Sequence, residues 1–345
     1  MNNPFDEFYH VPNSQELLDI AFKRAMRSSA KVSKNAPILI KAKKKESKRI
    51  KVAVDDLVNR LLKIIKMVPI INELPDFYRE LASLLVNIDE LKLYLGKING
   101  IIPVLSNIQR EYIKKVSHIE IPKEGDKLRR AAFGRISSII NKQNKTLEYL
   151  NNIRGYLREI PSIDYTLPCV VVAGYPNVGK SSIVREISTN KKIEVQEYPF
   201  TTKKLNLGHL TIEKKFDTIQ IQIMDTPGIL DRPMSKRNNI ELQAILALRL
   251  IADLILFIFD PTPACGYNID SQLELYHEIK ENFIKEKEIE LLIVFNKIDL
   301  AKESELSFLK ERLNLTDNDI FYTNALSGEN LESIIIYLKK KYANS

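Results

Sequence analysis

The sequence predicts two domains of different fold class: an all-α helical bundle over residues 1–165, then an α/β domain with a doubly wound sheet over residues 166–345. In the first part, apolar residues recur at spacings of three and four, with almost no strand pattern. In the second part, short β-branched runs alternate with helical segments, which is typical of a sheet covered by helices on both faces. A chain of 345 residues is long enough for both domains.

The first part contains several amphipathic segments. Ser14 is expected to cap the first of them, whose apolar stripe runs from Leu17 to Ala25. The others are 52–68, 76–88, 88–115 with an interruption at Pro103, and 124–157. Their lengths and the short connections between them predict an antiparallel bundle.

Strands are predicted for six runs of the second part. These runs are 169–173, 209–214, 218–224, 254–260, 291–296 and 320–323. In a doubly wound sheet, ligands bind beyond the carboxyl ends of the strands. The residues that follow these runs are therefore the candidates for a binding site.

The composition indicates a cytosolic protein with an anionic partner. Cys169 and Cys265 are too few for a disulfide framework or a zinc site, so a cytoplasmic location is expected. No apolar run reaches the roughly 18 residues that a membrane helix needs, so no membrane-spanning segment is expected. The net charge of +8 suits nucleic acid or an acidic membrane surface, or it reflects solvated helix faces.

Two groups of basic residues could contact phosphates. For the run between Lys41 and Lys51, contact with RNA and a solvated, partly mobile segment are both open. The second group lies within 127–135, where the alternative is that Arg129 or Arg130 pairs with carboxylates of the second domain. Contacts with phosphates would make the binding weaken steeply with salt.

The first predicted strand is followed by the loop GYPNVGKS, which matches the phosphate-binding pattern GxxxxGK[ST]. Its glycines let backbone N–H groups face the phosphates, and the following helix adds its positive N-terminal end. Lys180 is expected to neutralise β- and γ-phosphate oxygens, and Ser181 to supply its hydroxyl to Mg²⁺. The residues predicted to bind the nucleotide here are Gly174, Tyr175, Pro176, Asn177, Val178, Gly179, Lys180, Ser181 and Ser182.

Two further segments are predicted to respond to the γ-phosphate. Asp225 begins the motif DTPG after the third predicted strand, where its carboxylate can hold the Mg²⁺ shell. Gly228 can offer its backbone N–H to the γ-phosphate because no Cβ obstructs the approach. A threonine of the pair Thr201 and Thr202 can ligate Mg²⁺ only when the γ-phosphate is present, which makes this loop a switch.

The motif NKID, after the fifth predicted strand, predicts guanine as the base. The Asp299 carboxylate can accept two hydrogen bonds from the N1–H and 2-amino edge of guanine, which adenine does not offer. The stem of Lys297 can lie along the ring, while Asn296 ties this loop to the phosphate-binding loop. Ala325 is expected to meet guanine O6 through its backbone N–H, with Asn324 in place of the usual serine.

Together these motifs predict a Ras-like P-loop domain that binds GTP and GDP with Mg²⁺ and hydrolyses GTP to GDP and phosphate. Ile229 stands where Ras-like enzymes place the glutamine that orients water, so hydrolysis is expected to be slow or to use another device. Asn177 is a candidate for such a device, since it could hold K⁺ against the phosphates. The alternative is that Asn177 only shapes the loop.

The strings GYPNVGKSS, YPFTTK, NLGH, DTPGILDRP, NNIELQAILAL, CGY and NKID resemble those of the nucleolar GTP-binding protein (Nog) family of Obg-related GTPases. The resemblance continues upstream in KLRRAAFGRISSI and YLNNIRGYLREIPSID. It implies a four- to five-helix N-terminal domain before the Ras-like domain, and it selects Thr202 of the threonine pair. Lys180, Thr202 and Gly228 are then the predicted catalytic set. The end of the sequence at Ser345, after the last predicted helix, predicts a short archaeal-type member.

The resemblance also implies a nucleotide switch in assembly of the large ribosomal subunit, bound to rRNA or to the subunit precursor. A protein-signalling or membrane-surface GTPase switch that binds no RNA is the alternative, although the sequence has no lipidation signal. A GTPase partner of an RNA-modifying enzyme is a third class, and such relatives usually carry an extra catalytic domain or cysteine. A monomer is expected, since nothing in the sequence argues against one.

Overall fold

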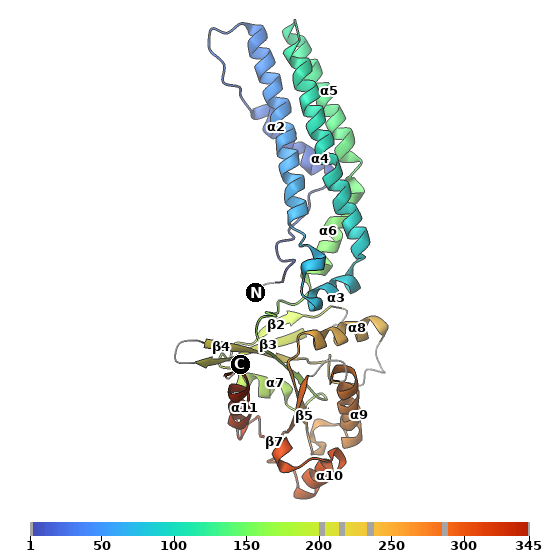
Figure 1. Ribbon diagram of the computed structural model, residues 1–345, viewed down its shortest axis with the longest axis vertical. Helices are drawn as coiled ribbons and strands as arrows, with labels where there is room; N and C mark the ends of the chain where they lie inside the picture. The colour runs from blue at the N-terminus through green and yellow to red at the C-terminus, as the bar shows by residue number, and fades with distance from the viewer. Residues whose placement is uncertain (1–2, 200–203, 214–217, 233–237, 285–288, 344–345) are drawn as a thin grey trace. The chain divides into compact units, whose positions relative to one another are not determined.

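The structure, a computed structural model, describes residues 3–199, 204–213, 218–232, 238–284 and 289–343. The chain divides into two compact units (Figure 1). The helical unit comprises Pro4–Leu74 and Val86–Arg158, and the sheet unit comprises mainly Pro75–Leu85 and Glu159–Ser345. The predicted fold class, a helical bundle followed by a doubly wound α/β domain, is confirmed.

The helical unit is a bundle of long helices. Its elements are α1 (Ser14–Arg27), α2 (Ile38–Lys66), the short η1 (Ile71–Glu73), α4 (Ile88–Ser117), α5 (Pro122–Asn141) and α6 (Asn144–Arg158). Helices α2, α4 and α5 run side by side (Figure 1), while α1 packs on α2 and α5, and α6 packs on α4. The apolar stripes meet in the core of this bundle, where Leu57, Leu105 and Ile136 are fully buried.

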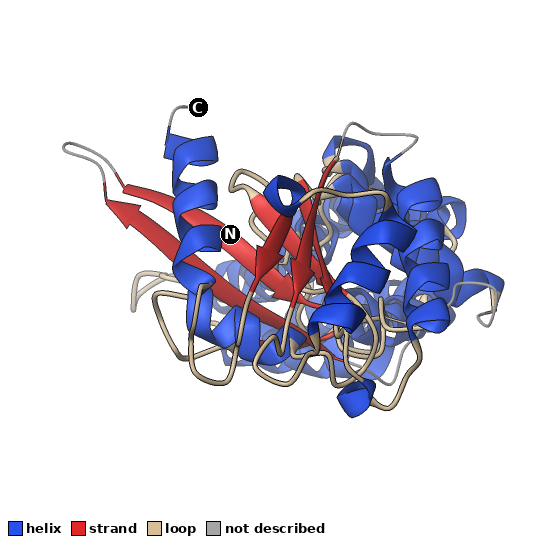
Figure 2. Ribbon diagram, turned by 90° about the horizontal axis from the view of Figure 1, so that it is seen from below, coloured by secondary structure: helices blue, strands red, loops and turns tan. Residues whose placement is uncertain are grey.

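The sheet unit contains seven strands among the described residues. They are β1 (Cys169–Ala173), β2 (Glu194–Glu197), β3 (Lys204–Glu213), β4 (Thr218–Asp225), β5 (Leu254–Phe259), β6 (Glu290–Phe295) and β7 (Ile320–Tyr322). Their order is β2-β3-β4-β1-β5-β6-β7, with β2 and β3 antiparallel to their neighbours and the other strands parallel. Helices cover both faces of the sheet (Figure 2), and β1 and β5 are buried along their whole length.

All six predicted strands occur, and five of them have ends within one residue of the prediction. The exception is β3, which begins at Lys204 rather than at His209; its predicted last residue, 214, lies outside the described residues. Strand β2 has no counterpart in the prediction. Its sequence, EVQE, carries no buried apolar alternation, and pairing with β3 at the edge of the sheet defines it.

The helices of the sheet unit include one from the N-terminal half of the chain. They are α3 (Asp76–Leu85), α7 (Lys180–Ile187), α8 (Asn239–Ala247), α9 (Ile269–Ile279), α10 (Glu303–Leu313) and α11 (Leu331–Ala343), with the short elements η3 (Leu248–Leu250), η4 (Pro263–Cys265), η5 (Lys280–Ile284) and η6 (Asp317–Asp319). Helix α3 packs on α8 and η3, and the Tyr78 hydroxyl exchanges hydrogen bonds of 2.8 and 2.9 Å with the main chain of Ile163. The domain boundary predicted between residues 165 and 166 stays a prediction, with α3 grouped in the sheet unit.

The first helix is capped by Asn13, so the prediction of Ser14 as its cap is wrong. The Asn13 side chain accepts the N–H of Glu16 at 2.9 Å, and the Glu16 carboxylate accepts the N–H of Asn13 at 2.9 Å. Ser14 is the first helical residue, and its hydroxyl donates to Asn144 Oδ1 at 2.9 Å. Asparagine caps helices at least as well as serine, so the local sequence favours neither residue.

Two predicted helix boundaries are also wrong. Pro103 does not interrupt its helix, because α4 is continuous over 30 residues with the proline inside. The proline removes one backbone donor, and packing of α4 along α2 and α5 keeps the helix together. The segment predicted over 124–157 is two helices, since α5 ends at Asn141 and α6 begins at Asn144.

The basic run from Lys41 to Lys51 is part of a helix. Helix α2 begins at Ile38, well before the predicted start at residue 52. Lysine, alanine and glutamate are good helix formers, so a helix is favoured although the apolar stripe is weak there. The structure thus gives this run a helical conformation, while RNA contact and a solvated, partly mobile segment both stay open as predictions.

Arg129 and Arg130 pair within the helical unit. Arg129 Nε lies 2.9 Å from Glu46 Oε2 on α2, and Arg129 also contacts Asp126. Arg130 Nε lies 2.9 Å from the same Asp126 carboxylate. Acidic residues on α2 and α5 thus pair with both arginines inside the helical unit, and the alternative pairing of Arg129 or Arg130 with carboxylates of the second domain stays a prediction.

Candidate nucleotide-binding site

The phosphate-binding loop joins β1 to α7 and depends on its glycines. Gly174 and Gly179 have φ angles of 140° and 105°, which residues with a side chain rarely adopt. A Cβ on Gly179 would lie 2.2 Å from Asn296 Nδ2, and one on Gly174 would lie 2.5 Å from the main-chain oxygen of Ile258. The loop is thus packed tightly against its neighbours, and α7 presents its N-terminus to a ligand of the loop.

Lys180 is the first residue of α7, and its ammonium group lies against the loop. Its Nζ donates to the main-chain oxygens of Gly174 at 2.6 Å and Tyr175 at 2.8 Å. The side chain is buried, and this burial lowers the pKa of Lys180, while the nearby carboxylates of Asp231 and Asp225 oppose that shift. A buried cation held in this way suits an anionic ligand.

Ser181 and Asp225 come together where α7 begins and β4 ends. The Ser181 hydroxyl donates to Asp225 Oδ2 at 2.5 Å. The other carboxylate oxygen, Oδ1, is buried and has no hydrogen-bond donor among the described residues. A buried acceptor without a partner is costly, and hydroxyl and carboxylate oxygens are ligands that Mg²⁺ prefers. These two residues therefore fit the predicted magnesium ion.

The segment that follows Asp225 is anchored to the central strand. Thr226 Oγ1 donates to the main-chain oxygen of Val172 at 2.8 Å, and Gly228 adopts a φ of 76°. Ile229 is buried, so an apolar side chain occupies the position of the water-orienting glutamine of Ras-like enzymes. Thr202, predicted as a switch residue, lies outside the described residues.

Asn296 connects three segments of the site. Its Nδ2 donates to the main-chain oxygen of Val178 at 2.8 Å, which confirms the predicted tie to the phosphate-binding loop. Its Oδ1 accepts the N–H of Ala325 at 2.9 Å and the hydroxyl of Thr323 at 3.2 Å. The Ala325 N–H is therefore already bonded to Asn296. The predicted bond to guanine O6 would share this N–H or replace its bond to Asn296. The Asn324 side chain accepts the N–H groups of Leu326 and Ser327 in its own loop.

Asp260, which no motif contains, holds the lysine of NKID. It follows β5 and is fully buried, and its Oδ2 lies 2.7 Å from Lys297 Nζ. Its Oδ1 accepts the N–H and the hydroxyl of Thr262 at 2.9 and 2.6 Å. Lys297 has a positive φ of 60°, so this ion pair steadies a side chain on an uncommon backbone conformation. The only sequence signal for Asp260 is its place at the carboxyl end of a predicted strand.

These segments surround one cavity of about 620 Å³, a usual size for a small-molecule pocket. Its lining residues are Pro176, Asn177, Gly179, Lys180, Ser181, Ser182, Pro227, Asp231, Asn296, Lys297, Asp299, Leu300, Asn324, Ala325 and Leu326. Asp299 is exposed at the wall, where its carboxylate can accept hydrogen bonds from a ligand. The cavity therefore brings the phosphate-binding loop and the predicted base-binding residues together.

Some predicted site residues do not line this cavity. They are Gly174, Tyr175, Val178, Asp225 and Gly228. Gly174 and Val178 contribute main-chain oxygens that hold Lys180 and Asn296. The ring of Tyr175 packs against Tyr267, with 4.6 Å between ring centroids, so its side chain supports the loop.

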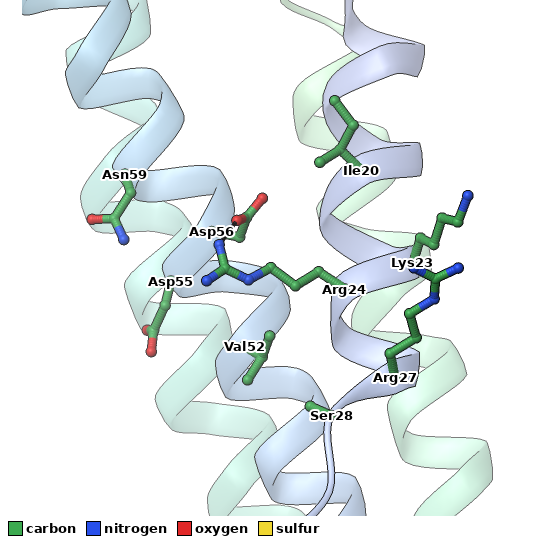
Figure 3. A pocket seen from close by; sticks show the side chains of 9 residues that line it. All are labelled: Ile20, Lys23, Arg24, Arg27, Ser28, Val52, Asp55, Asp56 and Asn59. Carbon is green, nitrogen blue, oxygen red and sulfur yellow. Dashed lines mark hydrogen bonds and ion pairs between the residues drawn. The ribbon is translucent and has the colours of Figure 1, made fainter.

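A second cavity, of about 660 Å³, lies between α1 and α2 of the helical unit (Figure 3). Arg24 reaches from α1 to Asp56 on α2 at 2.5 Å, and Asp56 also pairs with Arg60 at 2.7 Å. Lys23 and Arg27 point away from this pair (Figure 3). Because Asp56 neutralises the arginine that faces the cavity, and no glycine-rich loop adjoins it, this cavity lacks the features of a nucleotide site.

Three further findings concern other kinds of site. Within the described part of the chain, no helix is long and apolar enough to cross a membrane. The same residues contain no group of three or more His, Cys, Asp or Glu side chains that could hold a metal ion. Cys169 and Cys265 are both buried and are not joined by a disulfide bond.

Both halves of the chain match known proteins. The sequence model described as the NOG1 N-terminal helical domain matches residues 5–164, and that of nucleolar GTP-binding protein 1 (NOG1) matches residues 239–299. An uncharacterized protein of Methanocaldococcus jannaschii is 36% identical over 305 residues, which cover 88% of this chain and 83% of the relative. The chain belongs to the nucleolar GTP-binding protein family. The resemblance inferred from the motif strings is thereby confirmed.

The eukaryotic members of this family that match the chain are longer. Nucleolar GTP-binding protein 1 of Caenorhabditis elegans is 33% identical over 92% of this chain and 46% of its own length. The Encephalitozoon cuniculi protein of the same name is 34% identical over 87% of this chain and 56% of its own length. The chain thus spans about half the length of these relatives. Among solved structures, the G domain of the T. maritima FeoB iron transporter is 26% identical over 50% of this chain and 98% of that chain, with a TM-score of 0.37.

Proposed function

We propose that the protein binds GTP, hydrolyses it to GDP and phosphate, and acts through these two states as a switch in assembly of the large ribosomal subunit. The observation that carries the nucleotide part is the cavity that joins the phosphate-binding loop to Asp299 and Ala325. One wall offers an ammonium group and a helix N-terminus to phosphates, and the other offers a carboxylate to the edge of guanine. Membership of a family of GTP-binding proteins supports the same function.

The proposed nucleotide contacts divide into three groups. The main-chain N–H groups of 177–182 and the Lys180 ammonium would bind the β- and γ-phosphates. Ser181, Asp225 and Thr202 would hold Mg²⁺, which would neutralise charge on the phosphate oxygens. Asp299 selects guanine, while the Asn296 and Lys297 contacts described above fix the loop that carries it.

Hydrolysis is the attack of a water oxygen on the γ-phosphorus, with cleavage of its bond to the oxygen that bridges to the β-phosphate. Lys180 and the N–H of Gly228 stabilise the negative charge on the γ-phosphate oxygens. Ile229 cannot orient the water, so turnover by the chain alone is slow. Asn177, exposed at the cavity with a φ of 63°, is proposed to hold K⁺ as a further positive charge near the phosphates.

The ribosomal role is supported by charge and by family. The chain has a net charge of +8, and α2 exposes a series of lysines: Lys41, Lys44, Lys45, Lys48 and Lys51. Such residues can contact the phosphates of rRNA. Loss of the γ-phosphate would release the segments around Thr202 and Ile229, and the proposal is that this change alters the affinity for RNA. The cytoplasmic location and the monomeric state stay predictions.

Titration with GDP, GTP and ATP, together with an assay of phosphate release, tests the nucleotide part. We expect the guanine nucleotides to bind at least about 10³-fold more tightly than ATP, because adenine leaves Asp299 without its donors. Phosphate release should require Mg²⁺ and should be lost in Lys180→Ala but kept in the matched control Lys339→Ala, on the exposed face of α11. Similar affinities for ATP and GTP would contradict the assignment.

A further inference from the structure

The Asp225 carboxylate is held in an asymmetric way. Its Oδ2 accepts two hydrogen bonds, from the Ser181 hydroxyl at 2.5 Å and from Asn206 Nδ2 at 3.0 Å. Its Oδ1 is equally buried and has no donor among the described residues. Leaving one oxygen of a buried carboxylate without a donor is costly unless something else fills that position.

The strand register explains how Asn206 reaches this carboxylate. Strands β3 and β4 are antiparallel, and Asn206 is directly opposite Asp225 in the register. Side chains of directly opposed residues lie on the same face of a sheet and interact in pairs. The contact therefore follows from the pairing of two strands and does not depend on the conformation of a loop.

We propose that Asn206 is a positioning residue for the magnesium ion of the nucleotide site, an inference that rests on the proposed function. The Asn206 amide fixes the orientation of the Asp225 carboxylate, so that Oδ2 faces the protein and Oδ1 remains for the hydrated cation. The amide is suited to this role because it donates a hydrogen bond without adding a charge that would compete with the ion.

The same arrangement also orders the serine ligand. A hydroxyl has one proton and two lone pairs, and here the Ser181 hydroxyl donates its hydrogen bond to Asp225 Oδ2. Its lone pairs are then free to bind a cation. Because Asn206 donates to the same oxygen, it fixes the acceptor that orients the Ser181 hydroxyl.

Position along the chain adds a second consequence. Strand β3 begins at Lys204, two residues after Thr202, the predicted switch ligand of the same ion. Asn206 therefore attaches the start of β3 to Asp225. If this contact were only structural, its loss would lower the stability of the protein equally with and without Mg²⁺. If Asn206 positions the ligands of the ion, its loss instead weakens the effect of Mg²⁺ on the rate of nucleotide release.

The test is the rate at which fluorescent GDP leaves the protein, measured with saturating Mg²⁺ and with excess EDTA. The variants are Asn206→Ala and Asn206→Leu, the second of which keeps the volume of the side chain without its amide. Thr211→Ala, on the same strand opposite Gln220 and away from Asp225, is the matched control. Far-UV circular dichroism and thermal melting report whether each variant folds.

We expect the wild-type protein and Thr211→Ala to release GDP much more slowly in Mg²⁺ than in EDTA. In both Asn206 variants the ratio of the two rates should fall about tenfold, the range expected for one hydrogen bond to a charged group. The rate in EDTA should stay within about twofold of wild type, because the amide acts only through the ion in this account. The Mg²⁺ concentration that half-maximally slows release should rise by a similar factor.

An unchanged ratio in a folded Asn206→Leu would overturn the inference, as would an equal acceleration in Mg²⁺ and in EDTA. A wild-type protein that retains no GDP in either condition would instead overturn the proposed function. The two failures are therefore distinguishable within one experiment.

Discussion

Replacing Asn296 by alanine should remove the hydrogen bonds that join the NKID loop to the phosphate-binding loop and to the segment 323–325. The side chain makes hydrogen bonds of 2.8 Å to Val178, 2.9 Å to Ala325 and 3.2 Å to Thr323, and it is buried. Asn296→Ala removes all three and leaves their buried partners without a bond. In the wild-type protein these bonds hold the loops ready for the nucleotide, whereas in the variant the ligand must order them.

The size of the effect follows from the number of bonds. At about 1 kcal/mol of net contribution for each bond, the three together are worth about 3 kcal/mol. If all of this is lost from binding, the affinity for GDP falls about 100-fold, since 1.4 kcal/mol corresponds to a factor of ten. Part of the loss falls instead on the stability of the free protein, so about 100-fold is an upper limit.

The assay is a titration with fluorescent GDP, accompanied by urea denaturation of the free protein. Thr323→Val, which removes only the longest of the three bonds, is the matched variant and should weaken binding about fivefold or less. An Asn296→Ala protein with wild-type affinity and wild-type stability would refute this account of how the site is held together.

Three more predictions test single features of the two units. Asp299→Asn should weaken GTP binding about 100-fold and improve binding of xanthosine triphosphate, whose 2-carbonyl accepts from an amide; retained GTP affinity in a nucleotide titration would contradict the guanine assignment. GTP hydrolysis should be at least about tenfold faster in KCl than in NaCl at equal ionic strength, and equal rates would remove the proposed K⁺ role of Asn177. Burial raises the pKa of Asp56, but hydrogen bonds from Arg60 and Arg24 outweigh it, so the net pKa is lowered. The stabilising effect of Asp56 is therefore present above its unfolded pKa of about 3.9 and is lost as the pH falls through the lower folded value. In urea denaturation, Asp56→Asn should cost about 2 kcal/mol at neutral pH and much less in acid; a cost independent of pH would argue against the ion pairs.

Most residues that line the candidate nucleotide cavity could be predicted because they lie in short motifs. A loop such as 174–181 needs glycine for its backbone and lysine for its charge within a few neighbouring positions, so the local sequence identifies it. Asn296 could be placed for the same reason. Asp260 and Asn206 could not, because each acts through a partner that only the folded sheet brings near.

The helical half shows a different limit of prediction. Apolar spacing predicted where most helices run, but the ends of helices depend on weaker local preferences. Asn13 and Ser14 are both good caps; in the structure Asn13 makes the capping bonds with Glu16, while the Ser14 hydroxyl donates to Asn144. Helix α3 was expected among the N-terminal helices because of its order in the chain. It packs on α8 instead, and the spacing of apolar residues does not predict such a long-range contact.

The central claim, a nucleotide switch on the large ribosomal subunit, is tested most directly by co-sedimentation. The purified protein would be mixed with large or small ribosomal subunits, with GDP or a non-hydrolysable GTP analogue, across a salt series. We expect binding to the large subunit or its precursor that depends on the nucleotide and weakens steeply with salt. No association with the large subunit in either nucleotide state would contradict the ribosomal role and would favour a signalling switch that binds no RNA.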